Sequence, residues 1–282
     1  MRDKYDHRNN RNSNIWVFIK GAVIGGTMLV PGVSGGTMAM ILNIYDKLIS
    51  SVSSFMKDKR NSLLFLVIFA AGAGAGMILF SKPLLHLIET HTMPTLYFFM
   101  GAVVGGIPLI LKQAGTKRFS IRDVFYIFIG ITIVFAVSHV PADKMGAAAG
   151  DGIHGIVFLM AAGLFIAIGL VLPGISVSYL LLIIGLYDET MMAISRLYMP
   201  YLIPLAVGLG AGIIVTTKMI EKALTIYPHP TYTMILGFVL GSVTEVFPGI
   251  PHGALLPLSI AAFFAGAFLI MLLTRSETTR TL

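Results

Sequence analysis

The chain contains no cysteine and few charged residues. The absence of cysteine excludes disulfides, thiolate metal sites, thiol nucleophiles and iron–sulfur clusters. Charged residues make up 12% of the 282 residues, whereas a soluble domain carries roughly 25%. Hydrophobic residues make up 56%, and the mean hydropathy is +0.86. An ordinary soluble globular protein is therefore excluded, and the recurring apolar runs between Ile15 and Thr274 predict a small multi-spanning membrane protein.

The sequence contains the same passage twice. Residues 30–46 read VPGVSGGTMAMILNIYD and residues 172–188 read LPGISVSYLLLIIGLYD, so that Pro-Gly-aliphatic-Ser is followed at the same distance by Tyr-Asp. Further matches keep a constant offset of 136 residues: Gly72/Gly208, Gly74/Gly210, Gly76/Gly212, Lys82/Lys218, Pro94-Thr95/Pro230-Thr231, Gly101/Gly237, Gly105/Gly241 and Gly130/Gly266. Because the order of the matches is kept, we interpret the chain as two homologous halves, 15–140 and 154–275. Polar tails at 1–14 and 276–282 flank them.

Each half contains three apolar stretches close to the roughly 20 residues that a helix needs to cross a bilayer. These stretches are 62–80, 94–112 and 121–140 in the first half, and 200–217, 230–248 and 254–274 in the second. Each half begins differently, with two arms of about 16 residues joined at the Pro-Gly, within 15–50 and 155–193. Arms that short predict a re-entrant hairpin. We therefore expect an all-α integral membrane fold with about six transmembrane helices and two re-entrant helical hairpins.

The positive charges indicate how the halves are oriented. Three crossings per half, or five if the hairpin arms also cross, is an odd number, so the second half must be inverted relative to the first. With the N-terminus inside, 17 of the 20 Lys and Arg residues fall on the inner side, and only Lys82, Lys144 and Arg196 fall outside. This bias predicts cytoplasmic N- and C-termini. It also accounts for the net charge of +7 without nucleic acid, although it does not distinguish hairpins from ten spans.

The two Pro-Gly tips are the candidate site. Broken backbone at membrane depth is tolerated only where it is buried in protein or lines a cavity. A helix that starts there directs free N–H groups and hydroxyls into that space, and such an N-terminus favours an anion, especially phosphate. The alternative is that these residues only cap and kink buried helices. The expected helix breaks are Pro31, Gly32, Pro173 and Gly174, and the expected phosphate-binding residues are Ser34, Gly35, Gly36, Thr37, Ser176 and Ser178.

The PGVSGGT at 31–37, the PGIS at 173–176, the two Tyr-Asp pairs and the glycine-rich segment at 72–76 resemble the bacterial polyprenyl-phosphate translocases called PopT, formerly a domain of unknown function. The resemblance covers the chain after the first tail. It implies a transporter that carries undecaprenyl phosphate from the outer to the inner leaflet of the cytoplasmic membrane, for reuse in cell-wall synthesis, by alternating access at a midplane phosphate site. We expect no cofactor and no metal. The second tip departs from the first, because Val177 and Ser178 replace Gly35 and Gly36, which puts phosphate contacts there in doubt.

Moving an anion toward a negative interior costs about 2.3 kcal/mol per charge per 100 mV. We therefore expect coupling to a proton or another ion, with Glu245, Asp46 and Asp188 as candidate coupling acids. The repeat-related Lys82 and Lys218 are candidates for capturing and releasing the phosphate, or else they extend their ammonium groups to the membrane interface.

Two other functions remain open on the residues alone. One is a membrane phosphatase acting on polyprenyl diphosphate, a family with a Pro-Gly-x-Ser-Arg-Ser motif, but Gly35 and Val177 occupy the arginine position. The other is a channel or symporter for a small anion. The glycines at 72–76 and their counterparts could pack the halves together or pack two protomers into a homodimer, and the sequence leaves both open.

Overall fold

The computed structural model describes residues 2–30, 33–115, 120–139 and 152–278. Within these residues all regular structure is helical, in twelve helices. They form two compact units, residues 1–112 with 243–282 and residues 113–242. The units differ from the sequence halves, since the third span of each half groups with the other half's second span.

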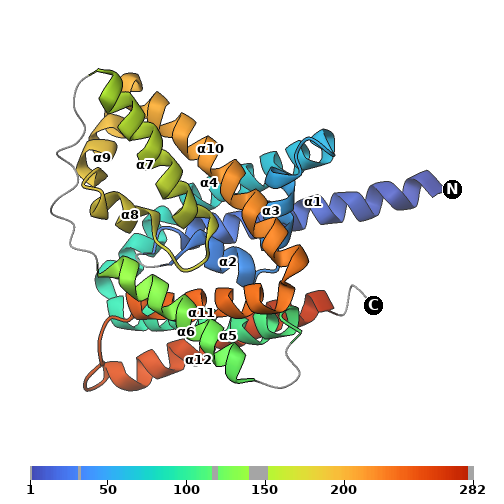
Figure 1. Ribbon diagram of the computed structural model, residues 1–282. Coiled ribbons are helices and arrows are strands. Elements are labelled where there is room, and N and C mark those ends of the chain that lie inside the picture. The colour runs from blue at the N-terminus through green and yellow to red at the C-terminus, as the bar shows by residue number, and fades with distance from the viewer. Residues whose placement is uncertain (1, 31–32, 116–119, 140–151, 279–282) are drawn as a thin grey trace. The chain divides into compact units, whose positions relative to one another are not determined.

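The helices are labelled in Figure 1. Those of the first unit are α1 (Arg2–Thr27), α2 (Gly35–Ile41), α3 (Tyr45–Ser53), α4 (Lys59–Thr90), α5 (Thr92–Gln113) and α12 (Leu255–Thr278). Those of the second unit are α6 (Ile121–Ser138), α7 (Ile153–Val171), α8 (Val177–Ile183), α9 (Tyr187–Ser195), α10 (Met199–Ile226) and α11 (Pro228–Val246). Helix α1 thus starts within the segment predicted as a polar tail.

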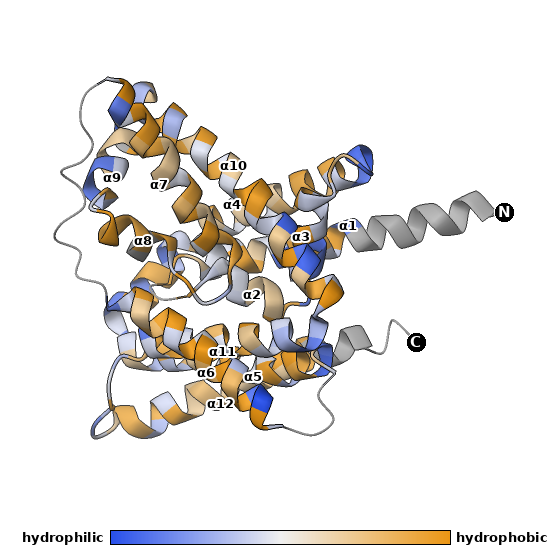
Figure 2. Ribbon diagram, viewed as in Figure 1, coloured by the Kyte–Doolittle hydropathy of each residue, from blue (hydrophilic) through white to orange (hydrophobic). Residues whose placement is uncertain are grey.

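Six helices of the described chain are long and apolar enough to cross a membrane: α4, α5, α6, α7, α10 and α12. This confirms an all-α, multi-pass membrane protein with six candidate spans. Only 17% of the most apolar window of α4 is buried, as expected of a helix whose outer face meets lipid. Figure 2 shows mainly hydrophobic colours along α7 and α12.

The six candidate spans of the structure differ from the six predicted spans in one helix. Helix α7, predicted as a hairpin arm, has 19 residues and reaches a mean hydropathy of 2.3 over its best window. Helix α11, predicted as the span 230–248, is not among the six. The reason is local composition, because α11 opens with the polar sequence PHPTYT whereas His154 is the one polar residue of α7.

Glycines set the close packing of α1 against α4. A Cβ added at Gly72 would collide with the carbonyl oxygen of Phe18, and one added at Gly76 would collide with that of Ala22. The two backbones therefore touch directly, as is usual where small residues line a membrane helix interface. In the described part of the chain, a Cβ added at Gly74 between them would meet no atom within 4 Å. Gly72 and Gly76 thus pack two helices of the same half together. A homodimer stays a prediction.

The same contacts recur between α7 and α10, which lie side by side in Figure 1. A Cβ at Gly208 would collide with the Met160 carbonyl, and one at Gly212 would press on the Leu164 backbone. These four residues are the sequence counterparts of Gly72, Phe18, Gly76 and Ala22, at offsets of 136 on the long helix and 142 on the arm. Each long helix therefore packs on the first arm of its own half in the same register.

The helices predicted as second and third spans pair across the halves. A Cβ at Gly101 of α5 would collide with the Phe263 carbonyl of α12, and one at Gly237 of α11 would collide with the Ile127 carbonyl of α6. Both residues of the second contact lie 136 positions from their counterparts in the first. This exchange explains why α12 joins the first unit and α6 the second.

The second arm of each predicted hairpin is broken in the structure. Instead of one helix over 34–49, α2 ends near Asn43, which has a φ of 54°, and α3 starts two residues later. The Ile44 N–H donates to the Ala39 carbonyl at 3.0 Å, a bond typical of a Schellman turn. Gly185, with a φ of 70°, makes the equivalent break between α8 and α9. Asn and Gly are the residues that best tolerate this left-handed backbone.

Candidate functional site

The first tip leads into α2. Pro31 and Gly32, predicted to break the helix, lie outside the described residues. Ser34 is the N-cap, with an extended backbone and no capping hydrogen bond from its side chain. The Met38 N–H donates to the Ser34 carbonyl at 3.1 Å and is the first helical bond of α2. The N–H groups of Gly35, Gly36 and Thr37 precede that bond, so they have no partner inside the helix.

Polar side chains at this tip are buried. Ser34 is 8% exposed and Thr37 is 1% exposed. The Thr37 Oγ1 atom has no hydrogen-bond partner among the described residues. A buried polar atom without a partner costs about 1–3 kcal/mol. The first tip therefore brings together backbone N–H groups that have no partner inside α2 and a buried hydroxyl that has no partner among the described residues.

The second tip has a tightly defined backbone. Gly174 has a φ of 83° and is buried, and a Cβ there would collide with the Phe238 carbonyl of α11 in the same unit. Only glycine fits both constraints. Ser176 is the N-cap of α8, again without a capping bond from its side chain, and it is half-buried. The side chain of Ser178 lies outside the description.

Apolar packing distinguishes the second tip from the first. Val177, which stands where the first tip has Gly35, packs against a buried cluster that includes Leu159, Ile166 and Leu181. The start of α8 is therefore lined by hydrocarbon on one side, whereas the start of α2 has glycine. The two tips belong to different compact units, so their meeting at a midplane site stays a prediction.

The three candidate acids occupy helix ends. Asp46 lies in the first turn of α3, and Asp188 in the first turn of α9. Both are exposed, and a carboxylate at a helix N-terminus is stabilised by the helix dipole. Glu245 is half-buried in the last turn of α11. A coupling role for these acids stays a prediction.

The two candidate capture lysines are both exposed. Lys82 lies on α4 and Lys218 lies on α10. Their helices are counterparts in the two halves, so the positions correspond as the repeat predicts. Capture and release of phosphate by these lysines remains a prediction.

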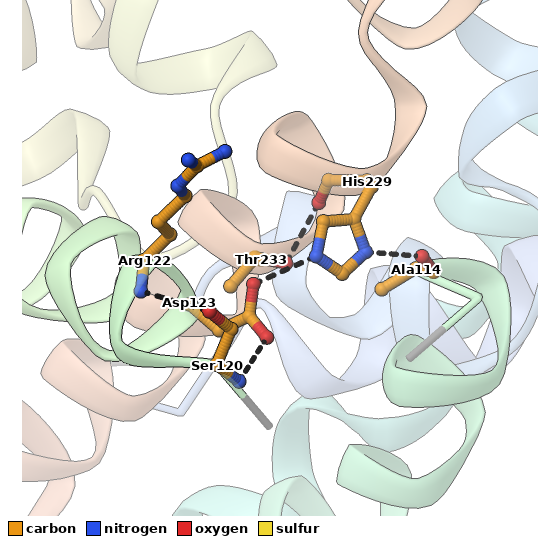
Figure 3. A network of polar contacts seen from close by, with 6 residues as sticks. All are labelled: Ala114, Ser120, Arg122, Asp123, His229 and Thr233. Carbon is orange, nitrogen blue, oxygen red and sulfur yellow. Dashed lines mark hydrogen bonds and ion pairs between the residues drawn. The ribbon is translucent and has the colours of Figure 1, made fainter. Parts of the chain in front are cut away.

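A polar network at the start of α6 and α11 was missed by the sequence analysis (Figure 3). Asp123 is 1% exposed and forms a capping box with Ser120, whose backbone N–H donates to Asp123 Oδ2 at 2.9 Å. His229 Nε2 lies 2.7 Å from Asp123 Oδ1, and its Nδ1 lies 2.7 Å from the Ala114 carbonyl oxygen. The Ser-x-x-Asp pattern at 120–123 signals the cap, but no local pattern indicates a contact between residues 106 positions apart.

Comparison with known proteins covers nearly the whole chain. A family model described as undecaprenyl phosphate translocase-like matches residues 24–254. A polyprenyl-phosphate transporter of Staphylococcus aureus is 33% identical over 272 residues, covering 92% of this chain and 96% of that protein. A polyprenyl-phosphate transporter of Vibrio cholerae is 27% identical over 250 residues, covering 82% of this chain and 77% of that protein. No solved structure matches the chain.

Proposed function

The chain belongs to the undecaprenyl phosphate translocase-like family, and from this premise we propose that it carries undecaprenyl phosphate from the outer to the inner leaflet of the bacterial cytoplasmic membrane. The observation that carries the proposal is the match to two polyprenyl-phosphate transporters over 92% and 82% of this chain. Six apolar helices support a route through a membrane. The phosphate headgroup is the part that needs a polar path, because the polyprenyl chain remains in lipid.

The headgroup binds at the first tip. The free N–H groups of Gly35, Gly36 and Thr37 supply donors, and the hydroxyls of Ser34 and Thr37 supply two more. A helix N-terminus attracts phosphate through both its unpaired N–H groups and its dipole. The unpartnered Oγ1 of Thr37 supports this assignment, because a phosphate oxygen would accept its hydrogen bond and remove a desolvation cost.

The second tip, with Ser176 and Ser178, acts from the opposite membrane face. The supporting observation is the repeated register of α1 on α4 and α7 on α10, which makes the two hairpins equivalent in construction. Inverted halves with re-entrant tips would expose one phosphate site alternately to each side. Both termini are then cytoplasmic, and Lys82 and Lys218 lie at opposite mouths.

Transport is favoured over hydrolysis. The relatives are transporters by name, and Gly35 and Val177 leave both tips without the arginine that a phosphatase of the Pro-Gly-x-Ser-Arg-Ser type would use to stabilise a transferring phosphoryl group. The remaining competitor is transport of a small anion such as inorganic phosphate, which the same donors would bind. The substrate specificity is therefore the feature to test.

The test is translocation of a short-chain polyprenyl phosphate in proteoliposomes, with inorganic phosphate and the corresponding diphosphate as competing substrates. We expect movement of the monophosphate lipid without hydrolysis, reduced by Ser34→Ala, Thr37→Val and Ser176→Ala. Thr225→Val is the matched control, because Thr225 is exposed on α10 and donates only to the Glu221 carbonyl. Movement of inorganic phosphate alone would establish the small-anion function instead, and release of phosphate from the diphosphate would establish an enzyme.

A further inference from the structure

The histidine at the start of α11 has acceptors at both ring nitrogens. Nδ1 lies 2.7 Å from the Ala114 carbonyl oxygen and Nε2 lies 2.7 Å from Asp123 Oδ1. A backbone carbonyl only accepts, and a neutral imidazole has a single N–H to donate. Two short hydrogen bonds therefore require one additional proton, held either as an imidazolium beside a carboxylate or as a carboxylic acid beside a neutral ring.

Loss of that proton would leave one acceptor without a donor. If the ring kept its Nδ1 proton, Asp123 would be an ionised side chain with 2% exposure and only the Ser120 N–H to stabilise it in the cap. If the ring kept its Nε2 proton, the contact with Ala114 would be lost. A buried carboxylate deprived of its partner is strongly disfavoured, so the proton and the contacts are linked.

These contacts hold the N-terminus of α11. Asp123 belongs to α6, and Ala114 belongs to the connection between α5 and α6. On the other side, Thr231 Oγ1 lies within hydrogen-bonding distance of the Ala223 and Tyr227 carbonyls, at 3.1 and 2.7 Å, at the end of α10. His229 thus stands at the junction of two long helices, and a change at its ring alters how α11 is held.

The charged groups around this site are few among the described residues. On α6, Asp123 contacts the ring, and Arg122 directs its side chain away from it (Figure 3). Near the end of α10 the ionisable groups are Glu221, Lys222 and the capping residue Tyr227. Lys112 lies in the last turn of α5, two residues before Ala114. His229 precedes the predicted 230–248 span, and its pKa is raised above the ordinary value by the Ala114 carbonyl and by Asp123, against the opposing effect of burial.

We propose that His229 and Asp123 form a proton-binding site that couples a proton to transport. When the proton is bound, His229 holds α11 to Asp123 of α6 and to the Ala114 carbonyl. When the proton leaves, one of these two hydrogen bonds is lost. The proposal rests on the lipid-phosphate transport proposed above. It assigns the coupling proton to residues other than Glu245, Asp46 and Asp188. On release the proton passes from the ring to water, and the ring retains one N–H.

The other unit offers no titratable counterpart. The positions equivalent to Asp123 and His229 are Ser259 and Met93. There, α5 is tied to the connection before α12 by the Tyr97 hydroxyl, which donates to the Gly249 carbonyl at 3.1 Å. A phenol–carbonyl bond of this kind does not need an added proton. The histidine–aspartate pair is therefore found in the second unit and not at the equivalent positions of the first.

The first experiment measures the proton directly. In the full-length protein in lipid, nitrogen NMR of labelled histidine and carbon NMR of labelled aspartate would report both groups, with His229→Gln and Asp123→Asn used for assignment. We expect either an imidazolium at His229 or a protonated carboxyl at Asp123 at neutral pH. A neutral ring beside an ionised Asp123 at neutral pH would overturn the proposal.

The second experiment measures coupling in proteoliposomes bearing a pH gradient. We expect wild-type lipid-phosphate movement to depend on the gradient, and Asp123→Asn and His229→Arg to move lipid without that dependence. Arginine keeps several N–H donors but does not titrate. We therefore expect His229→Arg to fold if the fold needs the hydrogen bonds to Asp123 and Ala114 but not the titration of the ring. His252→Gln is the matched control. Gradient-independent transport by wild type overturns the coupling, whereas absence of any lipid movement alongside an intact proton signal overturns the transport proposal instead.

Discussion

The two segments predicted as hairpins, 15–50 and 155–193, share a backbone plan and differ in side-chain chemistry. In both, a seven-residue helix follows the tip, a left-handed residue ends it, and a nine-residue helix follows. The first segment starts its short helix with Gly35 and buries the Thr37 hydroxyl, which has no partner among the described residues, whereas the second starts with Val177 packed into an apolar cluster. The repeat therefore maintains the scaffold, and the polar chemistry is concentrated in one copy.

The nine-residue helices α3 and α9, which we call the elbows, also differ in side-chain chemistry. In the first half, the Lys47 ammonium lies 4.8 Å from the centroid of the Phe65 ring. In the second half, the hydroxyls of Thr190 and Tyr201 are 2.8 Å apart, and Tyr201 is the counterpart of Phe65. Each elbow is joined to its long helix, by a cation–π contact in one case and by a hydrogen bond in the other. Equivalent geometry has thus been kept with different interactions.

The largest expected effect is loss of folding when the shared scaffold is overpacked. Gly72→Val and Gly208→Val place side-chain atoms against the backbones of Phe18 and Met160, which cannot move aside as a flexible side chain would. We expect both variants to lose most of the monodisperse protein in size-exclusion chromatography. Gly74→Val is the matched control, because a Cβ at Gly74 would meet none of the described atoms within 4 Å. A tolerated Gly208→Val would mean that the halves are not packed alike.

The next effect separates the two tips by exchanging one residue. In Gly35→Val the new side chain meets the Met28 side chain, which is flexible enough to move, so the protein should fold but transport should be nearly abolished. The reverse change, Val177→Gly, should retain transport and lower thermal stability, since Val177 packs in an apolar cluster. Translocation assays and melting curves on both variants check this pair. Equal transport losses would show that the tips contribute equally.

Removal of the buried hydroxyl should have opposite effects on stability and transport. Thr37→Val keeps the shape of the side chain and eliminates an unpartnered polar atom, so the substrate-free protein should be more stable by about 1–3 kcal/mol. Transport should fall, because one phosphate donor is gone. Melting temperature and translocation are measured together, with Thr225→Val as control. A destabilised Thr37→Val would indicate that the hydroxyl already has a partner in the protein.

The proton site predicts a pH-dependent stability confined to the second unit. Because the pKa of His229 is raised above 6.5 in the folded protein, its stabilising effect is complete below 6.5 and is lost as the pH rises through the raised pKa. The melting temperature of wild type should therefore exceed that of His229→Gln most at low pH, and the difference should shrink as the pH rises. Tyr97→Phe, which breaks the corresponding tie in the first unit, should lower stability equally across this range. A flat difference for His229→Gln would contradict the assignment.

The smallest effects are expected at the elbows. Tyr201→Phe removes a hydrogen bond worth about 0.5–1.5 kcal/mol, and Lys47→Gln removes the cation–π contact of the exposed Lys47 ammonium, worth about 0.5–1 kcal/mol. Both variants should remain active with slightly lower melting temperatures. Phe65→Tyr keeps the ring and is the matched control. A transport loss in either elbow variant, with the fold intact, would assign the elbow a part in the transport cycle.

Several features of the fold could be predicted from residues that lie close together in the sequence. Apolar runs such as 62–80 and 121–140 indicated spans because length and hydropathy are local properties. The paired Pro-Gly-x-Ser and Tyr-Asp motifs indicated the repeat. The break at Asn43 was missed, although Asn and Gly are the residues that favour left-handed backbone, because the apolar pattern continues across it. Helix α11 falls outside the six most apolar helices because its start is polar, so the span at 230–248 stays a prediction.

The sequence by itself determined that this is a multi-pass membrane protein, because the bilayer requires apolar segments of a minimum length and favours a charge bias, and both can be seen in the sequence. The duplicated motifs indicated two related halves. The tertiary structure alone decided which glycines touch which backbones, how the third spans exchange between the halves, and that His229 meets Asp123. Those contacts join residues far apart in the chain, and they depend on the direction in which each helix presents a given face. The polarity of the first tip is evident in the sequence, whereas the unmet hydrogen bond of Thr37 emerges only when the surrounding helices bury it.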